Sequence, residues 1–433
     1  MYQAPRGAFD ILPQEQRLWR YIEATAVALC HRAGYRRLDT PVFEEAGLFV
    51  RSVGPGTDIV EKEVYTFEDR GGDLLTLRPE GTAPVCRAYL EHGMHNLPQP
   101  VRLYYFCPVF RYERPQAGRY REHHQFGLEV LGDGDPVIDA EVVQLAWQLM
   151  ADLGLKGLSL RLNSIGDPAC RPGYLQELRA YYAAKVASLC ADCRVRLERN
   201  PLRLLDCKQE GCQAMIREAP RSIDHLCTEC RHHWERLLQY LALMEVPYAI
   251  EPRLVRGLDY YTRTVFEVQP PEEGAQSTIC GGGRYDGLIE ELGGRPTPGI
   301  GFAAGMERMV LNLRRQGVPV PPESPAAIVF VYRGGAAQEE AMRLAVALRQ
   351  EGIATVLAPA GRSLKAQMRY ATALESPYAV ILGEQELQRG TAALKSMRTG
   401  EQVEVGTVHL ARVVQRALDV PQERDLEEVV REV

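Results

Sequence analysis

Apolar residues recur every three to four positions between residues 14 and 33, a spacing that predicts an N-terminal helix. Gly34 follows as a residue that commonly ends a helix. The positions expected to share one buried face are Leu18, Ile22, Thr25 and Leu29. A second helix is expected to begin at Asp135-Pro136, with the carboxylate as its cap and proline at its first position, and to run to about residue 153.

Short apolar runs bounded by polar or turn residues predict β-strands in the regions that follow the first helix and precede residue 306. The clearest runs occupy 74–77, 101–106, 123–130, 265–268 and 299–304. The second and third of these runs flank a polar, basic loop and are expected to form a hairpin. A further helix is expected from Met306.

Residues 316–325, QGVPVPPESP, contain four prolines and predict a stiff, extended linker. Beyond it, strands expected at 327–332, 353–358 and 378–383 alternate with helices expected at 337–351 and 363–374. Such alternation is typical of a largely parallel sheet covered by helices.

The cysteines mark a change in composition, because six of the eleven lie between Cys190 and Cys230 in a helical, charged stretch. We therefore expect a helical, Cys-rich insertion at 166–248. It would divide a catalytic core into a first part at 1–165 and a second part at 249–318. A C-terminal α/β domain is expected at 326–425.

The composition is that of a globular protein, since 433 residues with 45% apolar side chains can bury a core in each expected domain. The net charge of -6 requires any nucleic-acid contact to come from local basic patches. No apolar stretch reaches the roughly 18 residues of a membrane span, and the N-terminal sequence lacks a secretory pattern. A cytoplasmic location with reduced cysteines is expected.

The hairpin loop holds four arginines: Arg111, Arg114, Arg119 and Arg121. Guanidinium groups bind phosphate through paired hydrogen bonds, so this loop could hold a triphosphate or an RNA end. No GxxxxGKS or GxxxxGKT motif occurs in the chain, which excludes the P-loop enzymes. A solvated basic hairpin is the alternative interpretation of the loop taken alone.

Two further segments favour an anionic ligand. In TLRPEGTAP, residues 76–84, an apolar strand ends and Thr82 is expected to cap a helix. In GIGFAAGMERMV, residues 299–310, a glycine-rich strand leads into a helix with Arg308 in its first turn. The helix dipole disfavours a cation there, so an anion beside Arg308 would stabilise it.

Together these segments resemble the class II aminoacyl-tRNA synthetases, and among them most closely the histidyl-tRNA synthetase family. The resemblance covers nearly the whole chain. Its most specific strings are TLRPEGTA at 76, FRYERPQAGRYRE at 110, LVRGLDYYTRTVFE at 254, GGGRYDGL at 281 and GFAAGMER at 301. It implies an α+β fold, with an antiparallel sheet flanked by helices, the helical insertion and a C-terminal α/β anticodon-binding domain.

The resemblance also implies an activity: ATP activates L-histidine to histidyl-adenylate and pyrophosphate, and histidine then passes to the 3′ end of tRNA(His). Arg111, Arg256 and Arg308 would be catalytic, stabilising the charge that builds on the phosphates. ATP would contact Arg111, Glu113, Arg119, His123, Gly305 and Arg308, together with Mg²⁺. His123 replaces a phenylalanine common in the family, which implies weaker stacking on adenine with some pH dependence.

Other roles follow from the same resemblance. The residues expected to bind histidine are Glu80, Thr82, Gln125, Glu129, Tyr260, Tyr261 and Tyr285. The residues expected to bind tRNA are Arg114 and Gln116 at the acceptor end, and Arg362, Lys365 and Arg369 on one helical face of the anticodon-binding domain. Pro41, in LDTPVFEE, resembles the proline of the class II dimer motif and implies a homodimer.

The two CxxC pairs, Cys190 with Cys193 and Cys227 with Cys230, form a plausible template for one tetrahedral, structural zinc site. Six unligated thiols, with Cys207 and Cys212, are the alternative. A thiol redox protein is disfavoured because the pairs lack a thioredoxin-like βαβ setting. A histidine-binding regulatory subunit of ATP phosphoribosyltransferase is the alternative function, but such a relative usually lacks the C-terminal domain and the arginine set.

Overall fold

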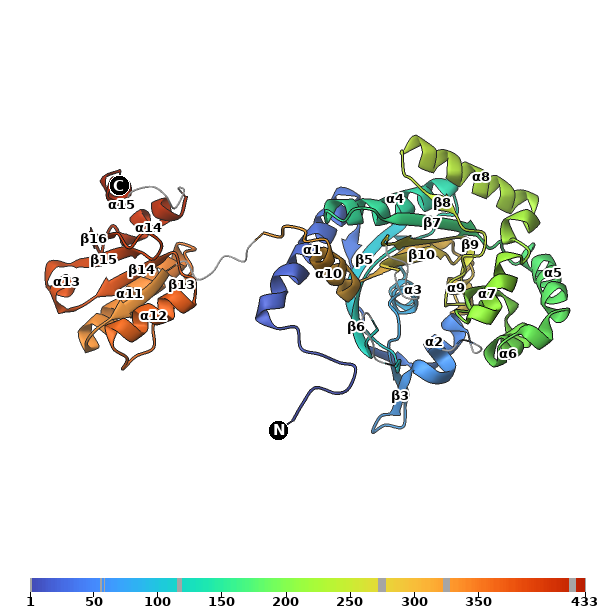
Figure 1. Cartoon of the computed structure of the whole chain (residues 1–433), viewed down its shortest axis with the longest axis horizontal. Coiled ribbons are helices and arrows are strands. Elements are labelled where there is room, and N and C mark those ends of the chain that lie inside the picture. Colours follow the sequence, from blue (N-terminus) through green and yellow to red (C-terminus); the bar gives the residue numbers. More distant parts are fainter. Residues whose placement is uncertain are drawn as a thin grey trace. The chain divides into compact units, whose positions relative to one another are not determined.

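The structure is a computed structural model that describes residues 2–54, 57, 59–114, 119–271, 278–321, 328–419 and 426–432. The chain forms two compact units, Met1–Pro321 and Pro322–Val433 (Figure 1). The expected linker lies at this division; residues 316–321 form no helix or strand, and the rest of it falls outside the described residues. Among the described residues, no helix is both long enough and apolar enough to cross a membrane.

The first unit is built on an eight-stranded sheet in the order β1-β5-β6-β11-β10-β9-β7-β8. All neighbours are antiparallel except the two edge pairs, β1 with β5 and β7 with β8. The predicted antiparallel α+β architecture is therefore confirmed. The strands are β1 Arg36–Arg37, β5 Val101–Phe110, β6 Glu122–Leu131, β7 Ser159–Ser164, β8 Ala249–Ile250, β9 Thr262–Gln269, β10 Cys280–Arg284 and β11 Gly299–Gly305.

Helices α1 (Pro13–Arg32), α4 (Pro136–Asp152) and α10 (Met306–Arg315) share an apolar core with one face of this sheet. The buried positions of α1 are Trp19, Ile22, Ala26, Leu29 and Cys30, which include Ile22 and Leu29 of the expected face. Leu18 is partly buried against the same core, and Thr25 is only partly buried. The predicted start of α4 is confirmed, because Asp135 accepts a hydrogen bond from the Val137 N–H at 2.9 Å.

A smaller three-stranded sheet, in the order β2-β4-β3, leads into α3 (Thr82–Glu91). Its strands are β2 Phe43–Glu45, β3 Tyr65–Glu68 and β4 Leu74–Leu77. Thr82 was expected to cap α3, but it is instead the first residue of that helix. The Glu80 carboxylate satisfies the free N–H groups instead, at 2.6 Å from Thr82 N and 2.8 Å from Ala83 N.

The expected insertion consists of two structural parts. Helices α5 (Arg171–Ala183), α6 (Ala191–Arg199) and α7 (Glu210–Arg217) enclose their own apolar cluster, which includes Tyr174, Leu178, Leu197, Leu204 and Ile216. Helix α8 (Thr228–Leu243) packs against α4, and its buried side chains belong to the core of the large sheet. We call the segment of α5–α7 the cysteine lobe.

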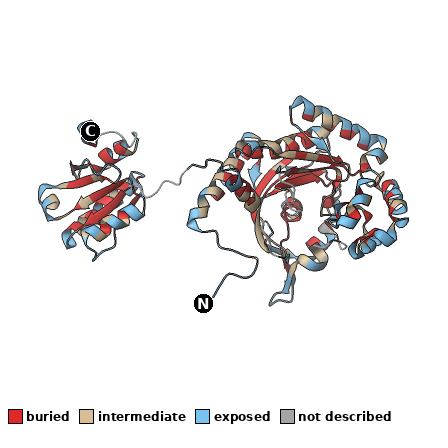
Figure 2. Cartoon of the chain, in the orientation of Figure 1, coloured by how far each residue is buried: buried red, intermediate tan, exposed pale blue. Residues whose placement is uncertain are grey.

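The second unit is a five-stranded sheet in the order β13-β12-β14-β15-β16. Strands β13 (Thr355–Leu357), β12 (Ile328–Tyr332) and β14 (Tyr378–Leu382) are parallel, whereas β15 (Thr391–Ser396) and β16 (Gln402–Gly406) extend them antiparallel. The expected largely parallel sheet is therefore a mixed one. Its helices include α11 (Gly335–Gln350), α12 (Leu364–Ala373) and α14 (Leu410–Asp419), and Figure 2 shows the central strands buried between them.

Candidate active site

The central strands of the large sheet place a row of small residues beside a row of functional ones. Antiparallel pairing sets Gln125, Gly127 and Glu129 of β6 opposite Gly305, Ala303 and Gly301 of β11. Strand β10 continues the small row, with Gly281 opposite Ala303. Because side chains alternate between the two faces of a sheet, these positions share one face.

Two of these glycines are required by their neighbours. A Cβ atom on Gly281 would lie 2.4 Å from an Nη atom of Arg256, and one on Gly301 would lie 1.7 Å from a carboxylate oxygen of Glu129. Both distances are shorter than any tolerated contact. The missing side chains leave a hollow over the sheet that charged groups enter from its rim.

This hollow is a cavity of about 170 Å³, which we call the central cavity. It gathers residues from the hairpin, the segment before α3, the loop before β9 and the start of α10. The predicted site residues that line it are Glu80, Thr82, Arg111, Glu113, Arg119, His123, Gln125, Arg256, Tyr260, Tyr261, Tyr285, Gly305 and Arg308.

The three arginines expected to be catalytic are held from different elements. Nε of Arg111 donates a hydrogen bond to the Pro79 carbonyl at 2.8 Å. Arg256 forms an ion pair with Glu267 of β9. Arg308 donates to the Thr278 carbonyl. Burial lowers the pKa of Arg308, and the positive charges of Arg119, Arg111 and Arg256 lower it further, so like charges crowd this end of the cavity.

The expected adenine contacts lie beside these arginines. Nε of Arg119 is 3.0 Å from a Glu113 carboxylate oxygen, so the two residues are paired with each other in the absence of a nucleotide. Burial lowers the pKa of His123 to about 3, assisted by the charges of Arg111 and Arg308. This pKa keeps the imidazole neutral near pH 7, and its stacking on adenine stays a prediction.

Glu129 does not itself line the central cavity and is buried, with 1% of its surface exposed. Its carboxylate accepts hydrogen bonds from Thr82 Oγ1 at 2.8 Å, from Tyr105 Oη at 3.1 Å and from Tyr285 Oη. Burial nevertheless raises its pKa to about 8. Nearby, Oε1 of Gln125 is buried without a hydrogen-bond partner among the described residues.

The expected tRNA contacts are dispersed. Arg114 is exposed and does not line the central cavity, and Gln116 lies outside the described residues. In the second unit, Lys365 and Arg369 are exposed on α12 one turn apart, but Arg362 precedes Ser363, the cap of that helix. The three side chains therefore do not share one helical face, because the helix begins only at Leu364.

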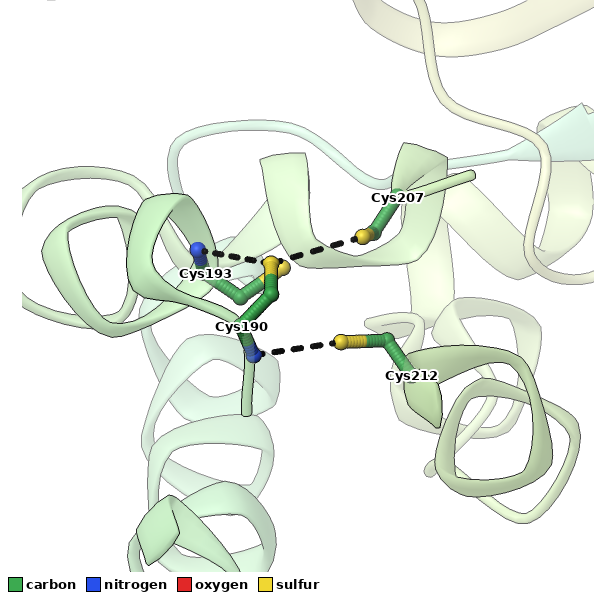
Figure 3. A group of neighbouring side chains, drawn as sticks. All are labelled: Cys190, Cys193, Cys207 and Cys212. Carbon is green, nitrogen blue, oxygen red and sulfur yellow. Dashed lines mark hydrogen bonds between the residues drawn. The ribbon is translucent and has the colours of Figure 1, made fainter. Parts of the chain in front are cut away.

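The predicted zinc set of Cys190, Cys193, Cys227 and Cys230 is wrong as one group. Cys190 and Cys193 lie with Cys207 and Cys212 (Figure 3), whereas Cys227 and Cys230 lie with Asp167 and Cys170. The reason is that a 3-10 helix, Pro201–Asp206, returns the chain to the start of α6, while Cys227 caps α8 against the sheet core.

Sequence reasoning missed several residues that support the site. Glu267, the partner of Arg256, lies directly opposite Gly281 on the neighbouring strand. Tyr105 lies opposite Gly127 and reaches Glu129. Both could have been found from strand alternation once the pairing was known. Glu307 accepts two hydrogen bonds from the His124 N–H, at 2.9 and 3.1 Å, and thereby joins α10 to the hairpin.

The cysteine lobe contacts the loop that carries Arg256. Nη1 of Arg203 donates to the Arg256 carbonyl at 3.1 Å, and Nδ2 of Asn200 donates to Asp259 Oδ1 at 2.8 Å. The first hydrogen bond connects the 3-10 helix that precedes Cys207 to the backbone of Arg256, and the second connects the residue before that helix to the side chain of Asp259.

Comparison with known proteins identifies the family of the chain. A family model described as histidyl-tRNA synthetase matches residues 7–309, and one described as anticodon binding domain matches 326–417. The chain is 56% identical to a histidine--tRNA ligase of Dehalococcoides mccartyi, over 94% of this chain and 97% of the relative. It is 52% identical to that of Desulforamulus reducens, over 93% and 96%.

The chain is also similar to solved structures. The apo histidyl-tRNA synthetase of S. aureus is 38% identical, with a TM-score of 0.81 over 96% of this chain and all of that one. A Bacillus halodurans C protein described as an ATP phosphoribosyltransferase regulatory subunit/histidyl-tRNA synthetase is 21% identical, with a TM-score of 0.63, and shows the shared fold alone. The family matches span both units, and the chain belongs to the histidyl-tRNA synthetase family.

Proposed function

We propose that this protein is a histidine–tRNA ligase that activates L-histidine with ATP and transfers it to tRNA(His). The observation that carries the proposal is the gathering of Arg111, Arg256 and Arg308 on one cavity, which is also lined by Thr82 and Tyr285, the hydrogen-bond partners of Glu129. The regulatory-subunit alternative is disfavoured, because the arginine set is complete and the anticodon-binding unit is present.

The first half-reaction requires positioning and charge stabilisation. The histidine carboxylate is itself the nucleophile, so no general base is needed. Arg111 and Arg256 would stabilise charge on the α-phosphate as the carboxylate attacks it, and Arg308 would hold the departing pyrophosphate. The ion pair with Glu267 fixes one edge of the Arg256 guanidinium and points the rest towards the cavity.

Histidine recognition would depend on Glu129. Among the described residues, the hydrogen-bond partners of its carboxyl group are neutral hydroxyls. With a pKa of about 8, Glu129 carries a proton near pH 7 and can share it with an imidazole nitrogen, which a side chain without such a ring does not offer. Tyr260, Tyr261 and Tyr285 would enclose the ring, and Glu80, Thr82 and Gln125 would contact the amino group.

Nucleotide binding would rearrange the Glu113–Arg119 pair. Glu113 would accept the adenine amino group, and Arg119 would turn to the outer phosphates beside Arg308, while His123 and the backbone at Gly305 contact adenosine. The carboxylates of Glu80, Glu113 and Glu307 are engaged by protein donors, so these residues fit a Mg²⁺ carried mainly by phosphate oxygens and water. Such an ion would neutralise phosphate charge.

The path of the tRNA is suggested by a groove of about 840 Å³ that continues from the central cavity. Arg119, Arg256 and Arg308 line both spaces. The groove adds Arg161, Lys208, Arg217 and Arg253, against three acidic residues, Asp206, Glu251 and Glu267. This local excess of positive charge fits the 3′ end of an RNA. Arg114 and Gln116 would touch the acceptor end, and Arg362, Lys365 and Arg369 the anticodon stem.

A homodimer and a cytoplasmic location complete the proposal. Exposed apolar side chains lie on and beside the small sheet: Val42, Phe43, Val50 and Phe67. Pro41 lies next to them and is also exposed. A second copy of the chain would bury this patch. In a cytoplasmic location the eleven cysteines of the chain would be kept as reduced thiols.

The test is exchange of labelled pyrophosphate into ATP by the full-length protein. Exchange should require histidine, and the other nineteen amino acids should not replace it. Charging of a tRNA(His) transcript should then follow. No exchange with histidine, or equal exchange with another amino acid, contradicts the proposal.

A further inference from the structure

We propose that the four cysteines of the cysteine lobe, Cys190, Cys193, Cys207 and Cys212, bind one structural zinc ion, a property beyond the ligase activity. Their Sγ atoms all lie within 4.8 Å of one another. Figure 3 shows the side chains converging from the start of α6, the end of the 3-10 helix and α7. None of them lines the central cavity.

The spacing suits a tetrahedral metal and not a disulfide. The Sγ atoms of Cys190 and Cys207 are 3.8 Å apart. Zinc–sulfur bonds of about 2.3 Å in a tetrahedron place the sulfur atoms about 3.8 Å from one another. A disulfide would require about 2.0 Å. Four thiolates close the coordination sphere, which is the arrangement of structural and not catalytic zinc.

Backbone N–H groups surround the sulfur atoms. Cys193 N lies 3.4 Å from Cys190 Sγ, Gln209 N lies 3.4 Å from Cys207 Sγ, and Cys190 N lies 3.5 Å from Cys212 Sγ. Such donors stabilise thiolate charge and fix the direction of each ligand. Three of the four sulfur atoms thus already have the supporting shell that a metal site needs.

The cysteine lobe also needs a cross-link. It has short helices and a small apolar cluster separate from the sheet core. Small cores of this kind are marginal without a metal or a disulfide. A single ion would join three segments that the apolar cluster alone holds weakly.

The second cysteine group provides a contrast. Asp167, Cys170, Cys227 and Cys230 also lie within 4.8 Å of one another. However, Asp167 is ion-paired with Arg263 at 3.2 Å, and its other oxygen accepts the Ala169 N–H at 3.0 Å. Its carboxylate is already compensated, so we assign the ion to the four-cysteine group and use the second group as the matched control.

The experiment measures zinc in full-length protein purified without chelators. The wild type and a Cys227→Ser/Cys230→Ser variant should each contain about one zinc per chain, whereas Cys207→Ser/Cys212→Ser should contain less than about 0.2. Two ions in the wild type, with one lost from each variant, would also support the assigned site. Zinc below about 0.2 per chain in the wild type, or zinc retained by Cys207→Ser/Cys212→Ser, overturns the proposal.

A second measurement covers the case in which the cysteine variants fail to fold. Wild-type protein treated with chelator is titrated with Co²⁺ and followed by visible absorption. Tetrahedral thiolate coordination predicts intense ligand-field bands and a sulfur-to-cobalt charge-transfer band that saturate at about one equivalent. A spectrum of octahedral, oxygen-bound cobalt overturns the proposal. Neither readout depends on histidine activation, so a failure here leaves the proposed ligase function untouched.

Discussion

The two sheets of this chain use their central strands in opposite ways. In the second unit, β12 reads IVFVY and all five residues are buried. In the first unit, β10 reads CGGGR and β11 reads GIGFAAG, so glycine and alanine replace branched side chains where the sheet is equally central. The central strands of the first sheet therefore leave a hollow, whereas the branched side chains of β12 pack in the core of the second unit.

This difference shows how small residues in the central strands of a sheet can leave room for a binding site. Branched side chains that pack against helices stabilise a sheet, and their removal forfeits that stabilisation. The first sheet instead exposes backbone and lets Glu129 and Arg256 approach closely. The following experiments test this contrast, from the largest expected effect to the smallest.

Arg256→His should reduce histidine-dependent pyrophosphate exchange by at least about 10³-fold, because it removes a fixed charge beside the α-phosphate. Histidine binding, measured by calorimetry, should remain mostly intact. Arg253→His, in the neighbouring groove, is the control and should keep exchange. Survival of exchange in Arg256→His would show that the role assigned to Arg256 is wrong.

Gly301→Ala should lower kcat/KM for histidine by roughly 10²-fold, because the added methyl group displaces the Glu129 carboxylate. Gly335→Ala, at the start of α11, is the matched change in the second unit, where an added Cβ meets no atom within 4 Å. It should alter neither exchange nor stability appreciably. Equal effects of the two substitutions would contradict the contrast between the sheets.

Glu129→Gln should raise the KM for histidine about 10²-fold and change its pH dependence. The complex holds one proton between Glu129, with a pKa of about 8, and the imidazole. Wild-type affinity should therefore be highest between the histidine pKa of about 6.5 and pH 8, and should fall on both sides. The variant should lose the fall at high pH. A wild-type KM that is constant across this range would refute the shared proton.

The same carboxyl should also affect folding. Its folded pKa of about 8 exceeds the ordinary value of 4.5, so the folded state binds more protons between these values. The free energy of unfolding of the ligand-free protein should decrease as the pH rises through this window. Denaturant titrations should show a smaller decrease for Glu129→Gln.

The triple change Arg362→Ala, Lys365→Ala and Arg369→Ala should raise the KM for tRNA about 10-fold, with a weaker dependence on salt. Pyrophosphate exchange should be unchanged, because these residues lie in the other unit. Arg412→Ala, exposed on α14, is the control. A loss of exchange, or an unchanged KM for tRNA, would contradict this assignment.

His123→Phe should leave the KM for ATP equal or lower, by no more than about 3-fold. The reason is that the neutral imidazole is itself an aromatic ring that can stack on adenine. The measurement is ATP dependence of exchange at two pH values. A large increase in KM would contradict stacking by residue 123.

Periodicity and alternation predicted much of the fold. The hairpin strands β5 and β6, the proline-started α4 and the strand through Gly299 to Gly305 were all expected, since local patterns determine them. The antiparallel extension of the second sheet was missed. The alternation of strands and helices continues through α13 (Glu384–Arg389) to β15 and stops there, because β16 follows β15 without a helix between them.

The site residues were predicted from motifs, but their partners were not. Two such pairs are Arg256 with Glu267 and Glu113 with Arg119. They depend on strand register and on side-chain rotamers, which local sequence patterns do not give. The cysteine grouping shows the same limit. Sequence spacing paired the two CxxC motifs, whereas the fold of the chain between them decided which thiols meet.

The crowding of guanidinium groups in the central cavity has a consequence for the stability of the folded protein. The positive charges of Arg119, Arg111 and Arg256 all act on Arg308, although Glu113 and Glu267 offset two of them. A bound polyanion would add counter-charge at this end of the cavity, and a ligand that binds only the folded state stabilises that state. The nucleotide is therefore expected to raise the free energy of unfolding as well as to react.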